Sequence, residues 1–306
     1  MFYSTLLYNL RRKILKIYVV VTIFNEENFI EDSLKSLLDQ TYQAKKILVV
    51  DDNSTDRTHE IVQKIESQSS ILKLIKYSSK TGHSPGKKVI EGFKFGLKQL
   101  DENYDIICKF DGDVTFPINY FEKIIHHYKR NPKIGMVSGL CFVKENQKWV
   151  YENIASKNHI RGPIKSYRKK CFDSIGGLKS SEGWDTVDEL IALHRGWEFY
   201  TDKMLKVKHL KATGSNYEKS VKFNEGKALY KIRSGIIITL ISAFKRAYNK
   251  KRISIPFYCI IGFLIAMIKN ESFIVTKEEG RFIRYHRWKN IYKRLTSFTI
   301  LYVYNK

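Results

Sequence analysis

The chain has 306 residues, 43% of them hydrophobic and 13% aromatic, which is enough apolar material for one large α/β domain or one domain with an appendage. This composition excludes an intrinsically disordered chain. The four cysteines are scattered and form no Cys-x-x-Cys pair, so the sequence argues against a zinc module and favours reduced thiols in a cytosolic protein.

The formal net charge of +23 is concentrated at the two ends of the chain. Residues 206–306 hold 22 Lys and Arg against 5 Asp and Glu, and residues 1–16 add four basic residues and no acidic one. Such a surface either meets nucleic acid or an anionic membrane, or only keeps the protein soluble. The longest apolar run, 253–268, is shorter than the roughly 20 residues that span a bilayer. Residues 1–15 do not have the pattern of a secretory signal.

Apolar runs along the chain predict alternating strands and helices. Residues 1–16 have the spacing of a short basic amphipathic helix, which either lies on a membrane interface or packs against the protein. Continuous β-branched runs then predict buried strands, separated by segments with helical spacing. We expect strands at 17–23, 46–50, 71–76, before Asp111, at 134–143 and at 149–151, and helices at about 28–39, 55–66, 86–100 and 117–130.

This alternation predicts an α/β fold with a mostly parallel, doubly wound central sheet and helices on both faces. After a last strand at 204–210, the composition becomes basic, partly apolar and helical. Helices are expected at 224–244 and, with a basic amphipathic character, at about 276–296. We divide the chain into an N-terminal helix 1–16, a main domain 17–212 and a C-terminal extension 213–306.

Polar side chains gather where three of the expected strands end, at Asn25–Glu27, Asp51–Ser54 and Asp111–Asp113. Ligands of parallel sheets bind outside the carboxyl ends of the strands, so these three loops should line one edge. The two carboxylates of the third loop flank a glycine and offer hard oxygen ligands for Mg²⁺ or Mn²⁺ together with a diphosphate. Taken alone, that triplet fits a solvated turn equally well.

A second group of acids opens the helix expected after residue 183. Asp185 stands where an N-cap belongs, and Asp188 follows three residues later. These carboxylates either cap the helix and favour its dipole, or take part in proton transfer.

Several segments together resemble the family 2 glycosyltransferases, which have the nucleotide-diphospho-sugar transferase (GT-A) fold. The resemblance covers about residues 17–212. Three departures are visible: Ile23 stands where the family usually has a proline, Trp184 precedes Asp185 where an acidic pair is usual, and no Gln-x-x-Arg-Trp motif follows. The matching segments are Val21–Glu27, Gln40–Tyr42, Val49–Thr58, Gly86-Lys87, Asp111-Gly112-Asp113 and Gly176–Asp185.

The resemblance implies an inverting enzyme that moves a sugar from a nucleotide-diphosphate donor, a UDP-sugar or GDP-sugar, to a hydroxyl acceptor in envelope polysaccharide or glycolipid assembly. It implies a divalent cation, Mn²⁺ or Mg²⁺, at Asp111 and Asp113. The base would be Asp185, favoured by its spacing from Gly176 and Gly196, with Asp188 as the alternative. Contacts to the donor would come from Thr22, Asn25, Glu26, Asp51, Asp52, Ser54, Lys87 and Asp111.

The basic ends suggest that the enzyme is cytoplasmic and attached peripherally to the inner face of the membrane, where its acceptor would be a glycan or a lipid-linked sugar. Alternatively, the run 253–268 packs in a core or a dimer contact. The rival function is a basic protein that binds nucleic acid or an anionic surface on the same scaffold. Acidic loops argue against nucleic acid because they repel phosphate. Sugar identity and oligomeric state stay open.

Overall fold

The computed structural model describes residues 14–79, 86–181, 183–211 and 223–304, which divide into two compact units. The first unit comprises the described residues up to 180 together with 184–211, and the second comprises 181, 183 and 223–304. The helix expected over 1–16 falls almost wholly outside the described residues, because only 14–16 belong to them.

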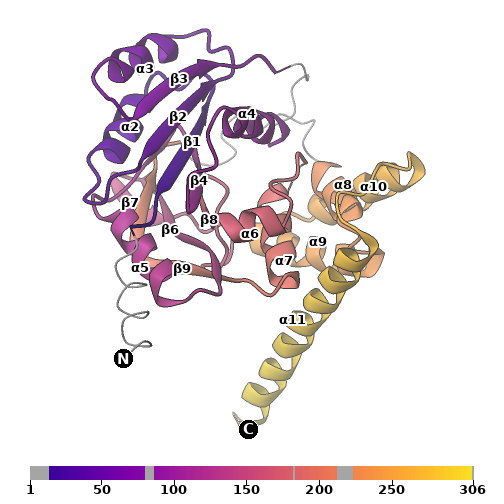
Figure 1. The fold of residues 1–306 in the computed structure, drawn as a ribbon. Helices are drawn as coiled ribbons and strands as arrows, with labels where there is room; N and C mark the ends of the chain where they lie inside the picture. The colour runs from indigo at the N-terminus through magenta and orange to yellow at the C-terminus, as the bar shows by residue number, and fades with distance from the viewer. Residues whose placement is uncertain (1–13, 80–85, 182, 212–222, 305–306) are drawn as a thin grey trace. The chain divides into compact units, whose positions relative to one another are not determined.

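A mixed sheet forms the centre of the first unit (Figure 1). Its first half, in the order β3-β2-β1-β4, is parallel, and its second half is joined mostly by antiparallel pairs. The predicted α/β fold with a central sheet is therefore confirmed, with the parallel strands mainly in its N-terminal half. The strands are β1 Ile17–Ile23, β2 Lys46–Asp51, β3 Leu72–Lys76, β4 Ile106–Asp111, β5 Val114–Thr115, β6 Ile134–Glu145, β7 Lys148–Tyr151, β8 Ile164–Arg168 and β9 Glu198–His209.

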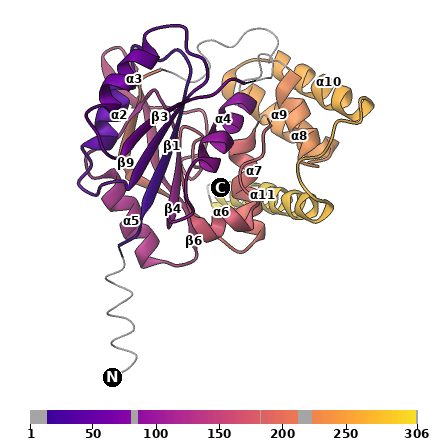
Figure 2. The same ribbon diagram turned by 45° about the horizontal axis from the view of Figure 1, so that its top comes forward.

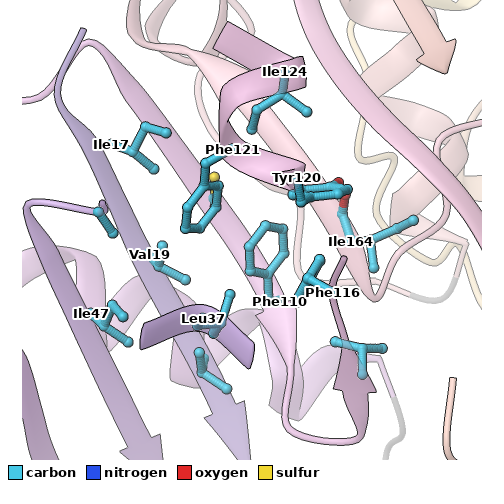
Figure 3. Close-up of a cluster of buried hydrophobic side chains, with 14 of the residues drawn as sticks. Ile17, Val19, Leu37, Ile47, Phe110, Phe116, Tyr120, Phe121, Ile124 and Ile164 are labelled. Carbon is cyan, nitrogen blue, oxygen red and sulfur yellow. The ribbon is translucent and has the colours of Figure 1, made fainter. Parts of the chain in front are cut away.

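Helices cover both faces of the sheet (Figure 2). Alternate residues of a strand point to opposite faces, so each face has its own core. Ile17 and Val19 of β1 join one core with α2 (Ile30–Leu38), α3 (Thr58–Glu66) and α5 (Tyr120–Arg130). Phe110, Phe116, Tyr120 and Phe121 form an aromatic cluster in this core (Figure 3). Burying these rings holds β4 and α5 together at the strand end that carries Asp111.

The opposite face of the sheet is covered by α4 (Lys87–Lys98), which approaches the strands closely through two glycines. A Cβ atom on Gly96 would lie 2.6 Å from Cγ2 of Val50, and one on Gly92 would lie 3.4 Å from Cγ2 of Thr22. Gly92 therefore sits over the carboxyl end of β1, and the helix begins beyond that edge. The first unit also contains two helices that follow β8 in the chain, α6 Lys169–Ser174 and α7 Trp184–His194.

Three expectations about the elements were wrong. Strand β8 was missed because Lys165, Ser166 and Arg168 interrupt its apolar pattern, although all but Arg168 are buried. Strand β9 begins at Glu198 and not at 204. The single helix expected over 224–244 is two helices, because Arg233 and Gly235 adopt positive φ angles of 57° and 79° that end one helix before the next begins.

The second unit is helical, with α8 (Asn224–Lys231), α9 (Ile236–Lys250), α10 (Ser254–Ile268) and α11 (Lys277–Tyr304). A Cβ atom on Gly262 of α10 would lie 2.0 Å from the carbonyl oxygen of Phe223, so this glycine permits the close crossing of α8 and α10. Across the described part of the chain, no helix is both long and apolar enough to cross a membrane.

Candidate active site

The register of the sheet brings three of the predicted loops together. Thr22 on β1 lies beside Val50 of β2 on one side and Asp111 of β4 on the other, and Ile23 lies beside Asp51. The carboxyl ends of β1, β2 and β4 therefore form one edge, as the loop chemistry predicted. We call this the carboxyl edge.

Side-chain hydrogen bonds tie the first two loops to each other. Ser54 Oγ accepts from the backbone N–H of Asn25 (3.0 Å), and Asn25 Oδ1 accepts from the backbone N–H of Thr55 (2.8 Å). Asn25 has a positive φ of 53°, which asparagine tolerates better than most residues. The side chains of Asn25 and Ser54 thus shape the edge by holding its loops.

The two aspartates that end β2 have different surroundings. Asp51 is buried, accepts from the backbone N–H of Ser54 (3.0 Å) and lies 2.9 Å from Nδ1 of His59. Asp52 is partly exposed and accepts from the backbone N–H of Ser79 (2.8 Å). Asp52 is the more accessible of the two to a nucleotide.

The third loop places its two carboxylates against different partners. Asp111 pairs with the buried ammonium group of Lys109, which also donates to the carbonyl of Gly162 (3.3 Å). Asp113 lies opposite the end of β9, where its Oδ2 is 3.6 Å from Nε2 of His209.

A chain of contacts behind His209 fixes its ring. Nδ1 of His209 lies 3.0 Å from Oε2 of Glu152, and that carboxylate also accepts from Nη1 of Arg161 (2.8 Å). The three side chains are buried. Metal-binding histidines commonly present one ring nitrogen to the cation while the other contacts a carboxylate, and His209 has such a carboxylate, Glu152, at Nδ1.

Buried oxygens without hydrogen-bond partners also lie at the carboxyl edge: Thr22 Oγ1, Glu26 Oε2 and Asp113 Oδ1. Burial, followed by the neighbouring charge of Asp113, raises the pKa of Glu26 to about 7 against the opposing effect of Lys211. Such acceptors cost free energy unless a cation or donor meets them. The described residues contain no group of three His, Cys, Asp or Glu already assembled as a metal site, but two carboxylates and a histidine suit a cation that a diphosphate would complete.

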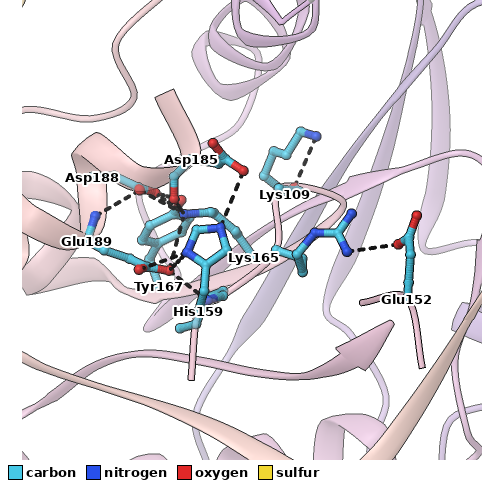
Figure 4. A network of polar contacts seen from close by, with 11 residues as sticks. Lys109, Glu152, His159, Lys165, Tyr167, Asp185, Asp188 and Glu189 are labelled. Carbon is cyan, nitrogen blue, oxygen red and sulfur yellow. Dashed lines mark hydrogen bonds and ion pairs between the residues drawn. The ribbon is translucent and has the colours of Figure 1, made fainter. Parts of the chain in front are cut away.

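Asp185 is the accessible carboxylate of the second acidic group (Figure 4). It is the second residue of α7 and not its N-cap, its side chain is 31% exposed, and its Oδ2 is 3.5 Å from Nε2 of His159. Burial alone would raise the pKa of Asp185, but the contact with His159 and the charge of Lys165 lower it to about 2. Asp185 is therefore ionised at neutral pH and partly open to solvent.

Asp188 is buried and committed to structure. Both of its oxygens lie 2.7 Å from Nζ of Lys165, and it accepts from the hydroxyl of Tyr167 and from the backbone N–H of Glu189 (Figure 4). Burial raises the pKa of Asp188 to about 6, and Lys165 opposes this rise. With only 2% of its surface exposed, Asp188 has little access to an acceptor.

Two fully buried lysines lie between Asp111 and Asp188. Lys109 of β4 and Lys165 of β8 are directly opposite in the register, and their ammonium groups lie 5.2 and 5.4 Å from the ring centre of Trp184. Like charges at such positions destabilise a sheet unless they are neutralised. Asp111 neutralises the first lysine and Asp188 the second.

Lys87 stands at the first position of α4, and its Nζ lies 3.7 Å from Glu91 Oε1. Because Gly92 covers the end of β1, Lys87 lies beyond the carboxyl edge. No contact between Lys87 and the other site residues is present among the described residues.

Sequence reasoning missed five polar residues of this region. They lie in strands and loops between residues 152 and 209, most of them beside other polar residues, and none belongs to a recognisable spacing. No local signal distinguishes them, because the partners that accompany their burial are not sequence neighbours. They are Glu152, His159, Arg161, Lys165 and His209.

The model of the family "Glycosyl transferase family 2" matches residues 18–180, more than half of the chain, and the chain belongs to this family. The predicted resemblance is thereby confirmed, and the protein is a glycosyltransferase of the GT-A type. The poly-beta-1,6-N-acetyl-D-glucosamine synthase of Staphylococcus aureus is 26% identical over 163 residues, 53% of this chain and 34% of that protein. The aligned part thus spans about a third of that relative.

An uncharacterised glycosyltransferase of Haemophilus influenzae is 28% identical over 42% of this chain and 38% of its own length. Among solved structures, S. aureus TarS 1–349 in complex with UDP-GlcNAc has a TM-score of 0.55 at 18% identity, covering 72% of this chain and 65% of that one. Mannosyltransferase PcManGT from Pyrobaculum calidifontis, in complex with GDP-Man and Mn²⁺, has a TM-score of 0.54 at 14% identity, covering 99% and 91%. These likenesses show the fold.

Proposed function

We propose that the chain is an inverting, metal-dependent glycosyltransferase that uses a UDP-sugar or GDP-sugar. The observation that carries the proposal is the carboxyl edge, where Asp113 lies against His209 and where buried oxygens of Thr22, Glu26 and Asp113 have no hydrogen-bond partner among the described residues. A cation and a diphosphate would satisfy those oxygens.

Asp111, Asp113 and His209 would hold the divalent cation. The bond between Nδ1 of His209 and Glu152 leaves Nε2 directed at Asp113, in the orientation that a ligand requires. When bound, the cation neutralises the diphosphate leaving group as a Lewis acid. Lys109 holds Asp111 in place and offsets part of its charge before the donor arrives.

The nucleotide would lie against the loops that end β1 and β2. Asp52, partly exposed, would contact the base or ribose, while Asp51 supports the loop from its buried position. Thr22 and Glu26 would line the same pocket. Lys87 would approach the diphosphate from the start of α4.

Asp185 would remove the proton from the acceptor hydroxyl as it attacks the anomeric carbon. Its ionisation at neutral pH and its partial exposure suit this role. The alternative, Asp188, is already engaged by Lys165 and Tyr167.

The names of similar proteins guide the choice of donors to test. A relative that synthesises a poly-N-acetylglucosamine and a structural neighbour that binds UDP-GlcNAc make UDP-GlcNAc the first candidate, and GDP-Man is the second. The acceptor would be a hydroxyl of an envelope glycan or a lipid-linked sugar.

The test is a panel of nucleotide sugars, assayed for nucleoside diphosphate release with Mn²⁺, with Mg²⁺ and with EDTA. Asp113→Ala should abolish the metal-dependent reaction. Turnover that persists unchanged in EDTA and in Asp113→Ala would contradict the metal assignment.

We further propose that the second unit contacts an anionic membrane surface. Its α9 exposes a line of apolar side chains at helical spacing, Ile237, Ile241, Phe244 and Tyr248, in the most basic part of the chain. At low salt, the wild type should sediment with anionic liposomes, whereas the Phe244→Glu variant should stay in the supernatant. Equal sedimentation of both proteins, or none of either, would refute this contact.

A further inference from the structure

The second unit contains a cavity of about 250 Å³ whose lining consists of four basic residues. Three of them, Lys277, Arg281 and Arg284, lie four and three residues apart on one face of α11. The fourth, Arg233, comes from the connection between α8 and α9. None of these residues belongs to the carboxyl edge.

Arg233 and Arg284 are fixed in place by neighbouring groups. Nε of Arg233 donates to the carbonyl of Val275 (3.2 Å), and its guanidinium group lies 3.5 Å from the ring centre of Phe273. Nη1 of Arg284 donates to the carbonyl of Arg233 (2.7 Å). These contacts hold two cations on the cavity wall before any ligand arrives.

The local backbone is arranged to admit Arg233. This residue has a φ of 57°, which is costly for a side chain without local polar bonding to its own backbone. Gly280 stands inside α11, where glycine costs roughly 1 kcal/mol relative to alanine, and a Cβ atom there would lie 2.7 Å from the Arg233 side chain. Two locally unfavourable features, the positive φ of Arg233 and the glycine inside α11, therefore both accompany the placement of the Arg233 side chain at the cavity.

The four cations lack carboxylate partners. Among the ion pairs that the described residues form, none involves Arg233, Lys277, Arg281 or Arg284. Four like charges around one cavity repel each other, and an anion would relieve that repulsion.

We propose that this cavity binds a phosphoryl group, on a lipid headgroup or in solution. Guanidinium groups match phosphate oxygens in a planar, two-pronged geometry, and three arginines and one lysine line this cavity. A single carboxylate would leave most of the positive charge unbalanced, whereas a phosphomonoester or diphosphate carries two or more negative charges.

The test uses the full-length protein in EDTA, so that the carboxyl edge holds no cation for a diphosphate. Calorimetric titration with pyrophosphate should show binding by the wild type. The double variant Lys277→Gln/Arg281→Gln changes two exposed side chains and should bind at least about tenfold more weakly, because each charge-assisted bond contributes substantially. Lys289→Gln removes one exposed positive charge from the same helix outside the cavity and should bind like the wild type.

A second arm distinguishes the two sources. Vesicles with phosphatidic acid are compared with phosphatidylserine vesicles of equal surface charge. Binding of pyrophosphate supports a site for soluble phosphoryl groups, and a preference for phosphatidic acid that the double variant loses supports a headgroup site. The proposal is overturned if neither ligand binds, if the double variant binds both as the wild type does, or if Lys289→Gln weakens binding equally. Nucleoside diphosphate release, assayed separately, shows whether the carboxyl edge still functions.

Discussion

Asp185 and Asp188 lie one helical turn apart, and their amide variants should fail in different ways. Asp188→Asn keeps the shape of the side chain but removes the charge that faces Lys165, whose ammonium group has no exposed surface and sits 2.7 Å from both carboxylate oxygens. Removing one partner of a buried ion pair typically lowers the free energy of unfolding by about 3–5 kcal/mol. Glu189, 3.9 Å from the same ammonium group, offsets part of that loss.

For a unit of this size, 1 kcal/mol shifts the Tm by about 2–4 °C, so Asp188→Asn should lower it by about 6–20 °C. Asp185→Asn weakens the 3.5 Å contact with His159, which Glu189 also engages, and because Asp185 is partly exposed it should lower the Tm by less than Asp188→Asn does. Its sugar transfer should fall by about 10²–10⁴-fold, because a positioned general base is removed.

The two variants are compared by circular dichroism melting at pH 8, where both carboxylates are ionised in the wild type, and by nucleoside diphosphate release in the presence of acceptor. Donor binding, followed by the thermal shift with UDP or GDP and Mn²⁺, should survive in Asp185→Asn. If Asp188→Asn keeps the wild-type Tm but loses transfer, while Asp185→Asn transfers normally, then the base is Asp188 and the reasoning from burial is wrong.

Three further results are expected. Burial lowers the pKa of His159, but its contacts with Asp185 and Glu189 raise it to about 9. The protonated His159 side chain therefore stabilises the folded protein fully below pH 6.5, its pKa in the unfolded chain. This stabilisation is lost as the pH rises through about 9, its pKa in the folded protein. Urea unfolding should show a fall of about 2–4 kcal/mol over that window which His159→Gln lacks, and parallel slopes would refute the assignment. Gly96→Leu should destabilise the protein by at least about 1–3 kcal/mol, since its Cβ meets a strand side chain at 2.6 Å; an unchanged urea midpoint would show that α4 can move away. His209→Gln should raise the Mn²⁺ concentration for half-maximal activity about 10–100-fold, and an unchanged metal titration would remove His209 from the ligand set.

The sequence by itself predicted the alternating strands and helices from β1 to β4 and the edge at which their polar loops lie. Runs such as Ile17–Ile23 are long, β-branched and free of charge, so local pattern alone indicates buried strands. In a parallel sheet, the loops that follow such strands meet at one edge, and this geometric rule predicts that Asp51 and Asp111 lie at the same edge, as the register shows.

Local pattern failed wherever a long-range partner changes the cost of burying a charge. Lys165 can be buried in β8 because Asp188, 23 residues away, neutralises its charge. A prediction from hydropathy alone would place the same lysine on the surface. His209 faces Asp113 only because β9 pairs with β5 across the sheet, and Glu152 orients it from 57 residues away.

The sequence thus determined the fold class, the family and the edge of the sheet at which Asp51 and Asp111 lie, because these depend on short-range periodicity and on motifs that lie within single loops. Only the tertiary structure separated the accessible Asp185 from the buried Asp188 and brought four basic residues around one cavity. Burial and charge pairing are set by segments that are distant in the chain, and these contacts decide which carboxylate stays available for chemistry.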